Sequence, residues 1–90
     1  MICYKIYTQN KHLKWIRTTL NGLFSGYTIY KTEGFWQGKR EKSLTIEIIC
    51  PDDEFRFTEL KIQTLCKMLR GYNHQESVLV TSQRVNTLEN

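Results

Sequence analysis

At 90 residues the chain has room for one domain, and its 40% apolar and 24% charged residues are ordinary for a globular protein. Five glycines and one proline exclude collagen-like and low-complexity chains, and no apolar run reaches the ~20 residues that a membrane helix needs. The net charge of +4 is uneven, because residues 1–42 hold eight cations against two carboxylates and residues 43–90 hold five against seven. We therefore predict a single domain over 1–90, a cytoplasmic location without a signal peptide, no membrane partner, and a basic half that suits an anionic partner.

The first expected elements are a strand over residues 2–8 and a helix over about residues 11–25. Period-two alternation of side chains predicts the strand, and apolar residues at steps of three and four predict the helix, with Asn10 as its N-cap and Gly26 at its end. Trp15 lies off the apolar stripe of this helix. A Trp in that position is either an anchor in a protein interface or a side chain covered by the C-terminal tail.

A hairpin follows the first helix. If its turn is at residues 37–38, Ile29 faces Ile46, apolar pairs share one side of the sheet, and opposite charges meet across the strands. This agreement favours a tight turn, with a longer loop over residues 34–42 as the alternative.

The second half of the chain predicts a helix and a last strand. The helix begins somewhere from residue 53 to 58, and Gly71 lies near its end. Residues 77–83 are expected to form the strand, and residues 84–90 a polar tail or a short extra strand. The order β-α-β-β-α-β predicts a ferredoxin-like α+β fold, an antiparallel sheet with two helices on one face.

The other face of such a sheet is too apolar for a comfortably solvated surface. Its four large apolar residues are Tyr7, Tyr30, Ile49 and Leu79. Burial against a second copy of the chain is the simplest explanation, so we predict a homo-oligomer, with these four residues and Trp15 as its interface.

Motifs for catalysis or for metal binding are missing from the sequence. Cys3, Cys50 and Cys66 are too widely spaced for a disulfide framework or a zinc site. Neither His12 nor His74 belongs to a pattern that would bring a base to a nucleophile. No phosphate loop, metalloprotease motif or paired-carboxylate signature is found. We therefore expect no enzyme activity, no metal and no cofactor.

The segment over residues 34–42 is the most unusual part of the chain. It combines two aromatic side chains, which can stack on a base, with three cations, which can pair with phosphate. The candidate ligand-binding residues, here called the hairpin tip, are Phe35, Trp36, Lys39, Arg40 and Lys42. The alternative is a structural tip that packs over the sheet end or a neighbouring subunit.

The element order, the aromatic-basic hairpin and the last strand, Gln-Glu-Ser-Val-Leu-Val, together resemble small ferredoxin-like proteins of phages and mobile elements. More distantly they resemble the PII-type trimers, whose hairpin loops line ligand clefts between subunits. In motif the resemblance covers residues 34–49 and 75–80, and the long flexible loop of PII proteins is absent. The resemblance implies a non-catalytic binder that acts as an oligomer and blocks or titrates a host component.

Two functions stay open at this point. The first is an oligomer that captures a small anionic, nucleotide-like ligand or blocks a host protein through the hairpin tip. The second is a nucleic-acid-binding protein that uses the free sheet face and the basic N-terminal half. The second is less favoured, because RNA-recognition sheets carry aromatic residues on their central strands and residues 43–50 have none.

Overall fold

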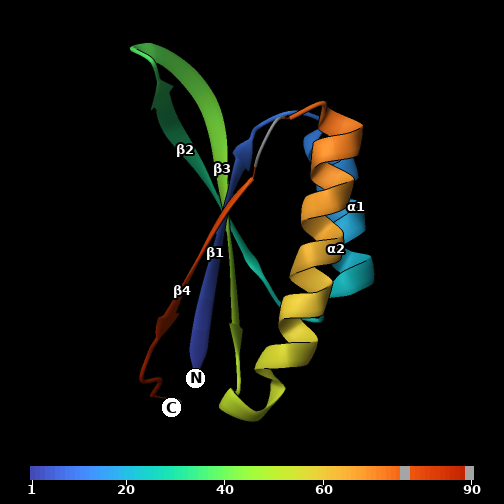
Figure 1. The fold of residues 1–90 in the computed structure, drawn as a ribbon, viewed down its shortest axis with the longest axis vertical. Helices are drawn as coiled ribbons and strands as arrows, with labels where there is room; N and C mark the ends of the chain where they lie inside the picture. The colour runs from blue at the N-terminus through green and yellow to red at the C-terminus, as the bar shows by residue number, and fades with distance from the viewer. Residues whose placement is uncertain (76–77, 89–90) are drawn as a thin grey trace.

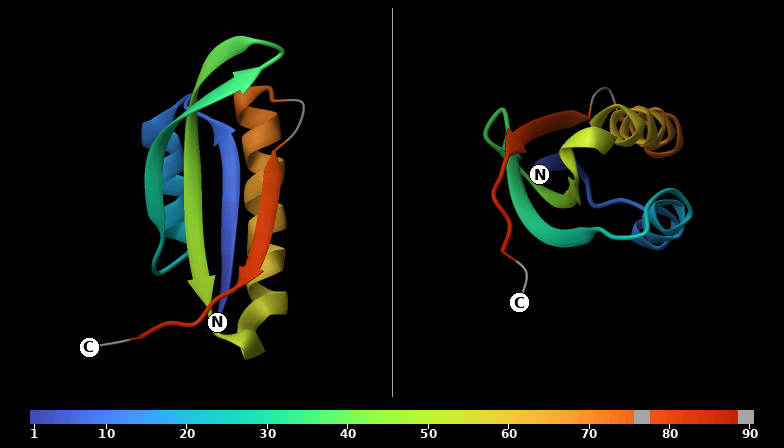
Figure 2. Two further views of the ribbon diagram at one scale, coloured as in Figure 1. Left: turned by 90° about the vertical axis from the view of Figure 1, so that its left-hand side faces the viewer. Right: turned by 90° about the horizontal axis from the view of Figure 1, so that it is seen from below.

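The computed structural model describes residues 1–75 and 78–88, and in them the predicted β-α-β-β-α-β order is confirmed. The elements are β1 (Ile2–Gln9), α1 (Leu13–Leu23), β2 (Thr28–Trp36), β3 (Lys39–Cys50), a 3₁₀ turn η1 (Asp52–Glu54), α2 (Phe55–Asn73) and β4 (Leu79–Arg84). The strands form one antiparallel sheet in the order β2-β3-β1-β4. Both helices cover one face of this sheet (Figure 1), and the other face, here called the open face, has no helix over it (Figure 2).

The hydrophobic core lies between the sheet and the two helices. Alternate residues of β1 and β3 point toward the helices, as period-two side-chain geometry requires, and Ile6 and Ile46 are fully buried there. The helices contribute residues at steps of three and four, among them Ile16 and Leu20 of α1 and Leu65 of α2. The core therefore fixes which side of each strand faces water.

The register of the β2–β3 hairpin is confirmed. Ile29 pairs with Ile46 and Trp36 pairs with Lys39, so the strands continue to a two-residue turn and the longer-loop alternative is wrong. Gln37 and Gly38 both have positive φ, 51° and 78°, which matches the twist that a tight hairpin turn needs. The far end of the hairpin bends away from the helices, toward the side of the open face (Figure 1).

Helix α1 begins and ends differently from the prediction. His12 precedes its first turn in a left-handed conformation, with φ 57°, and the Asn10 amide donates instead to the Lys42 carbonyl at 2.9 Å. The cause is a long-range contact, because the His12 ring is 2.8 Å from the Asn73 side chain at the end of α2. The helix ends at Leu23, so Gly26 is not its stop.

At the other end of the chain, α2 continues through Gly71 to Asn73, and His74 in a left-handed conformation caps it. The first residue of the predicted last strand, Ser77, lies outside the described residues. Strand β4 extends to Arg84, and residues 85–88 form no strand. No described helix combines the length and the apolar character needed to cross a membrane.

Candidate functional site

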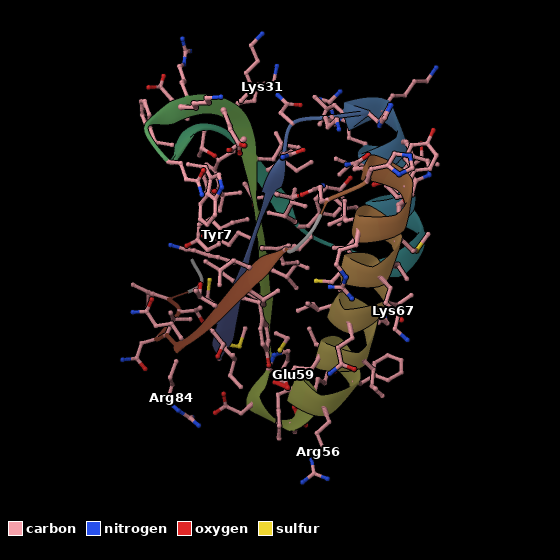
Figure 3. The ribbon with its side chains drawn as sticks, turned by 45° about the horizontal axis from the view of Figure 1, so that its top comes forward. Tyr7, Lys31, Arg56, Glu59, Lys67 and Arg84 are labelled. Carbon is pink, nitrogen blue, oxygen red and sulfur yellow. The ribbon has the colours of Figure 1, made fainter. Side chains whose placement is uncertain are left out.

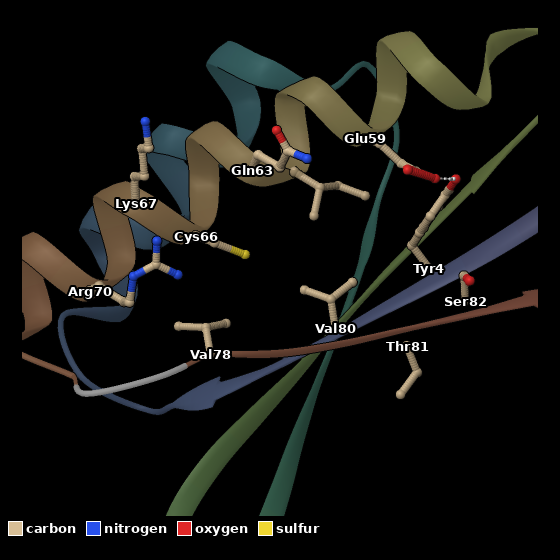
Figure 4. A pocket seen from close by; sticks show the side chains of 11 residues that line it. Tyr4, Glu59, Gln63, Cys66, Lys67, Arg70, Val78, Val80, Thr81 and Ser82 are labelled. Carbon is tan, nitrogen blue, oxygen red and sulfur yellow. Dashed lines mark hydrogen bonds between the residues drawn. The ribbon is translucent and has the colours of Figure 1, made fainter.

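A groove of about 490 Å³ separates α2 from the edge strand β4 (Figure 4). We call it the α2/β4 groove. It is lined by Tyr4, Glu59, Ile62, Gln63, Cys66, Lys67, Arg70, Val78, Val80, Thr81 and Ser82. Its size falls within the range of small-molecule sites, which are roughly 300–1,000 Å³.

The helical period explains which side chains of α2 face this groove. Glu59, Gln63 and Lys67 follow one another at steps of four and therefore lie on one side of the helix. Val78 and Val80 pack against the core from the opposite wall. The groove therefore has an apolar floor, formed by Ile62, Cys66, Val78 and Val80, and polar side chains of α2 along one side.

A hydrogen bond between Tyr4 and Glu59 lies at one end of the groove (Figure 4). The Tyr4 hydroxyl donates to Oε2 of Glu59 at 2.8 Å, and the two residues are 55 positions apart in the chain. Burial raises the pKa of Tyr4, and the hydrogen bond to the Glu59 carboxylate raises the pKa further. Tyr4 therefore remains a protonated donor and holds the carboxylate of an otherwise exposed helix residue in one orientation.

Two cations, Lys67 and Arg70, lie at the other end of the groove. Arg70 follows Glu59 by about 16 Å along the helix axis, at the usual rise per residue. Cys66 lies on α2 between Glu59 and Arg70. Burial raises the pKa of the Cys66 thiol, and the nearby Arg70 charge only partly opposes this shift. Cys66 is therefore a neutral thiol that contributes to the floor, and the groove is negative at one end and positive at the other.

The sequence indicates the hairpin tip as the ligand site, but in the structure its aromatic residues and its cations do not line the same hollow. Phe35 and Trp36 are two-thirds exposed and line a second hollow of about 580 Å³, together with Tyr7 and Leu79 of the open face. The three cations of the tip do not line this hollow. One of them, Arg40, forms an ion pair with Glu33 at 3.1 Å.

The predicted interface residues also fall into two groups. The residues exposed on the open face, on the side of the sheet away from the helices, are Tyr7, Tyr30, Ile49 and Leu79. Figure 3 shows Tyr7 there. Trp15 lies on the helical side, where its ring stacks on Tyr72 of α2 with centroids 4.1 Å apart. Its half-buried position is thus explained by a contact within the chain.

No pattern in the sequence indicates the α2/β4 groove. In the sequence Tyr4 is one residue of the expected strand over residues 2–8, and nothing marks Glu59 as its partner. Their pairing depends on the sheet order, which places β1 beside β4 and under α2. All three cysteines are free and buried. Among residues 1–75 and 78–88 no cluster of side chains could hold a metal ion.

No protein-family model matches the chain, and no curated protein matches it in sequence. Solved structures match in fold. A DUF3240 family protein from Shewanella baltica OS155 has a TM-score of 0.69 at 15% identity, over 99% of this chain and 93% of that one. CPII, a nitrogen regulatory PII-like protein from Thiomonas intermedia K12 bound to ADP, AMP and bicarbonate, has a TM-score of 0.62 at 15% identity, with the same coverage.

A phage SAM lyase is similar in two structures. Without ligand its TM-score is 0.67 at 23% identity, over 91% of this chain and 78% of that one. In complex with S-methyl-5′-thioadenosine its TM-score is 0.65 at 22% identity, over 91% of this chain and 79% of that one. The distant likeness to the PII-type fold is thereby confirmed. The expectation that the chain is not an enzyme is contradicted, because an enzyme shares this fold over nine-tenths of the chain.

Proposed function

We propose that this chain is a small homo-oligomeric protein that binds an adenosine-containing molecule in the α2/β4 groove, with S-adenosylmethionine as its substrate. The observation that carries the proposal is the Glu59 carboxylate, held by Tyr4 at the end of a groove of suitable size. A fixed carboxylate accepts hydrogen bonds from the two hydroxyls of a ribose. Two solved structures of this fold support the ligand class, since one holds ADP and AMP and the other S-methyl-5′-thioadenosine.

The proposed reaction breaks the bond between the sulfonium sulfur of S-adenosylmethionine and the γ-carbon of its amino-acid chain. The bonding electron pair stays on sulfur, which leaves as S-methyl-5′-thioadenosine, and an oxygen of the substrate's own carboxylate bonds to the same carbon to close a homoserine lactone. The sulfonium leaves as a neutral thioether, so the reaction needs orientation of the substrate and exclusion of water more than a strong nucleophile. Support comes from the phage SAM lyase of the same fold. That similarity also supports a phage origin, which is part of the proposal.

The homo-oligomer is proposed from the open face. Tyr7, Tyr30, Ile49 and Leu79 expose between 39% and 63% of their surface there, a large apolar area for one chain in water. A second copy covers this face most simply. The end of the β2–β3 hairpin extends past β1, whose pairing with β3 stops at Gln9 and Ser43. We propose that Phe35 and Trp36 contact ligand bound to a neighbouring copy. Light scattering tests the oligomer, which requires a mass above the 10.8 kDa of one chain.

The ligand is tested by calorimetric titration with S-methyl-5′-thioadenosine and with ADP, and turnover by chromatography after incubation with S-adenosylmethionine. Glu59→Gln keeps the shape of the side chain but removes its charge. We expect at least tenfold weaker binding and loss of turnover, with an unchanged melting temperature. Glu54→Gln is the matched control, because Glu54 is exposed before α2 and does not line the groove.

Failure of all adenosine ligands to bind at millimolar concentration would overturn the proposed function. Binding of a single-stranded oligonucleotide that falls steeply with salt would support the nucleic-acid alternative instead. A complex with a host protein that forms without any nucleotide would support inhibition. Neither alternative is supported by the site or by the comparisons.

A further inference from the structure

The two ends of the α2/β4 groove differ in charge, and this difference restricts which adenosine compounds the groove can bind well. Glu59 is at one end, while Lys67 and Arg70 are at the other. A neutral nucleoside would use only the Glu59 end. Two cations that face the same groove create a positive potential that favours an anionic group on the ligand.

The middle of the groove is apolar. Cys66 lines it from α2, and Val78 and Val80 line it from the opposite wall (Figure 4). Ile62 of α2 is a further apolar residue of the lining. This floor suits methylene and methyl groups. A ligand that matches the whole groove therefore has ribose hydroxyls near Glu59, an aliphatic segment over the floor, and an anionic group near Arg70.

We infer that Arg70, assisted by Lys67, binds the carboxylate of an amino-acid tail, so that the groove selects adenosine compounds that carry such a tail over those that lack it. The inference rests on the proposed function and adds the recognition of the tail. A guanidinium suits this task because its planar fork donates two parallel hydrogen bonds to a carboxylate. The backbone of Arg70 is fixed at the end of α2, since its carbonyl accepts hydrogen bonds from the amides of His74 and Gln75, and its side chain is exposed at the groove.

The recognition of a tail is tested with two ligands that share adenosine and a thioether but differ in the tail. S-adenosylhomocysteine carries the amino acid and contains no reactive sulfonium, whereas S-methyl-5′-thioadenosine lacks the amino acid. The unmodified protein is expected to bind S-adenosylhomocysteine about tenfold more tightly, as one charge-assisted contact contributes. Arg70→Gln should remove this preference by weakening S-adenosylhomocysteine alone, and S-methyl-5′-thioadenosine should bind as before.

Two further variants separate recognition from folding. Arg70→Lys keeps the charge without the fork, so an intermediate preference is expected, and Lys67→Gln should have a smaller effect than Arg70→Gln. Arg56→Gln is the matched control on the same helix, because Arg56 does not line the groove. Equal weakening of both ligands by Arg70→Gln, or no weakening of either, overturns the inference while leaving the proposed function in place. If the unmodified protein binds neither ligand, the proposed function fails as well.

Discussion

The α2/β4 groove and the hairpin tip are two candidate sites of opposite construction. The residues of the hairpin tip all come from one continuous segment, residues 34–42, and its aromatic side chains are mostly exposed. The groove is formed by residues from β1, α2 and β4, and its central hydrogen bond joins positions 55 residues apart. The tip can therefore be recognised from the sequence alone, whereas the residues of the groove come together only when the sheet forms.

The two regions also differ in how they depend on the core. Tyr4 is 3% exposed and belongs to the core as well as to the groove, while Phe35 and Trp36 are about two-thirds exposed. A change at the tip can thus alter binding without altering stability. A change in the groove wall affects both, which is why its tests need isosteric variants.

The largest expected effect concerns β3, the strand that runs from the tip into the core. Ile46 is fully buried between Ile6 and Ile29. Ile46→Asp would bury a carboxylate without a partner and should cost about 3–5 kcal/mol of unfolding free energy. Urea unfolding of the dilute, monomeric protein measures this loss.

Ile49→Asp is the control on the same strand, because Ile49 is 45% exposed on the open face. We expect about 0.5 kcal/mol or less in the monomer, together with loss of the oligomer. Equal destabilisation by the two variants in the monomer would contradict the assignment of the two faces of the sheet.

A smaller effect is expected at alkaline pH, and it belongs to the groove alone. Because the pKa of Tyr4 is raised from 10.0, the folded chain holds this proton more tightly than the unfolded chain. The contribution of Tyr4 to stability is therefore complete below pH 10 and is lost as the pH rises above it. Tyr4→Phe should lose less stability than the unmodified protein between pH 10 and 11.

Urea midpoints at pH 8, 10 and 11 for both proteins test this prediction. Cys3 and Cys66 also have raised pKa values, which come mainly from burial, but both proteins share them. The difference between the two slopes therefore reports Tyr4. Identical slopes would show that burial and the hydrogen bond to Glu59 do not raise the pKa of Tyr4 in the folded chain.

The smallest expected change in stability is at the hairpin tip. Phe35→Ala combined with Trp36→Ala should alter the unfolding free energy by about 0.5 kcal/mol or less, because both side chains are mostly exposed. Ligand affinity, measured by the same calorimetric titration, then shows whether the tip takes part in binding. A large loss of stability would identify the tip as a structural element.

The features that the sequence predicted well are local. The hairpin register follows from neighbouring charges and apolar pairs, and Ile29 does face Ile46. The features that it missed depend on distant partners. Asn10 is a good N-cap by residue type, yet Asn73 holds His12 at the start of α1 instead. The partner of Trp15 could not be predicted, because no pattern in the sequence indicates that its ring stacks on Tyr72.

The position of β4 in the sheet has a consequence for the order in which the molecule is completed. Ile2, at the start of β1, pairs with Arg84, so this edge of β1 stays unpaired until residues 79–84 are available. Closing a loop of this length costs more entropy than forming the helices or the hairpin does. A chain that has been synthesised only as far as α2 therefore lacks residues 78–82, which form the opposite wall of the α2/β4 groove.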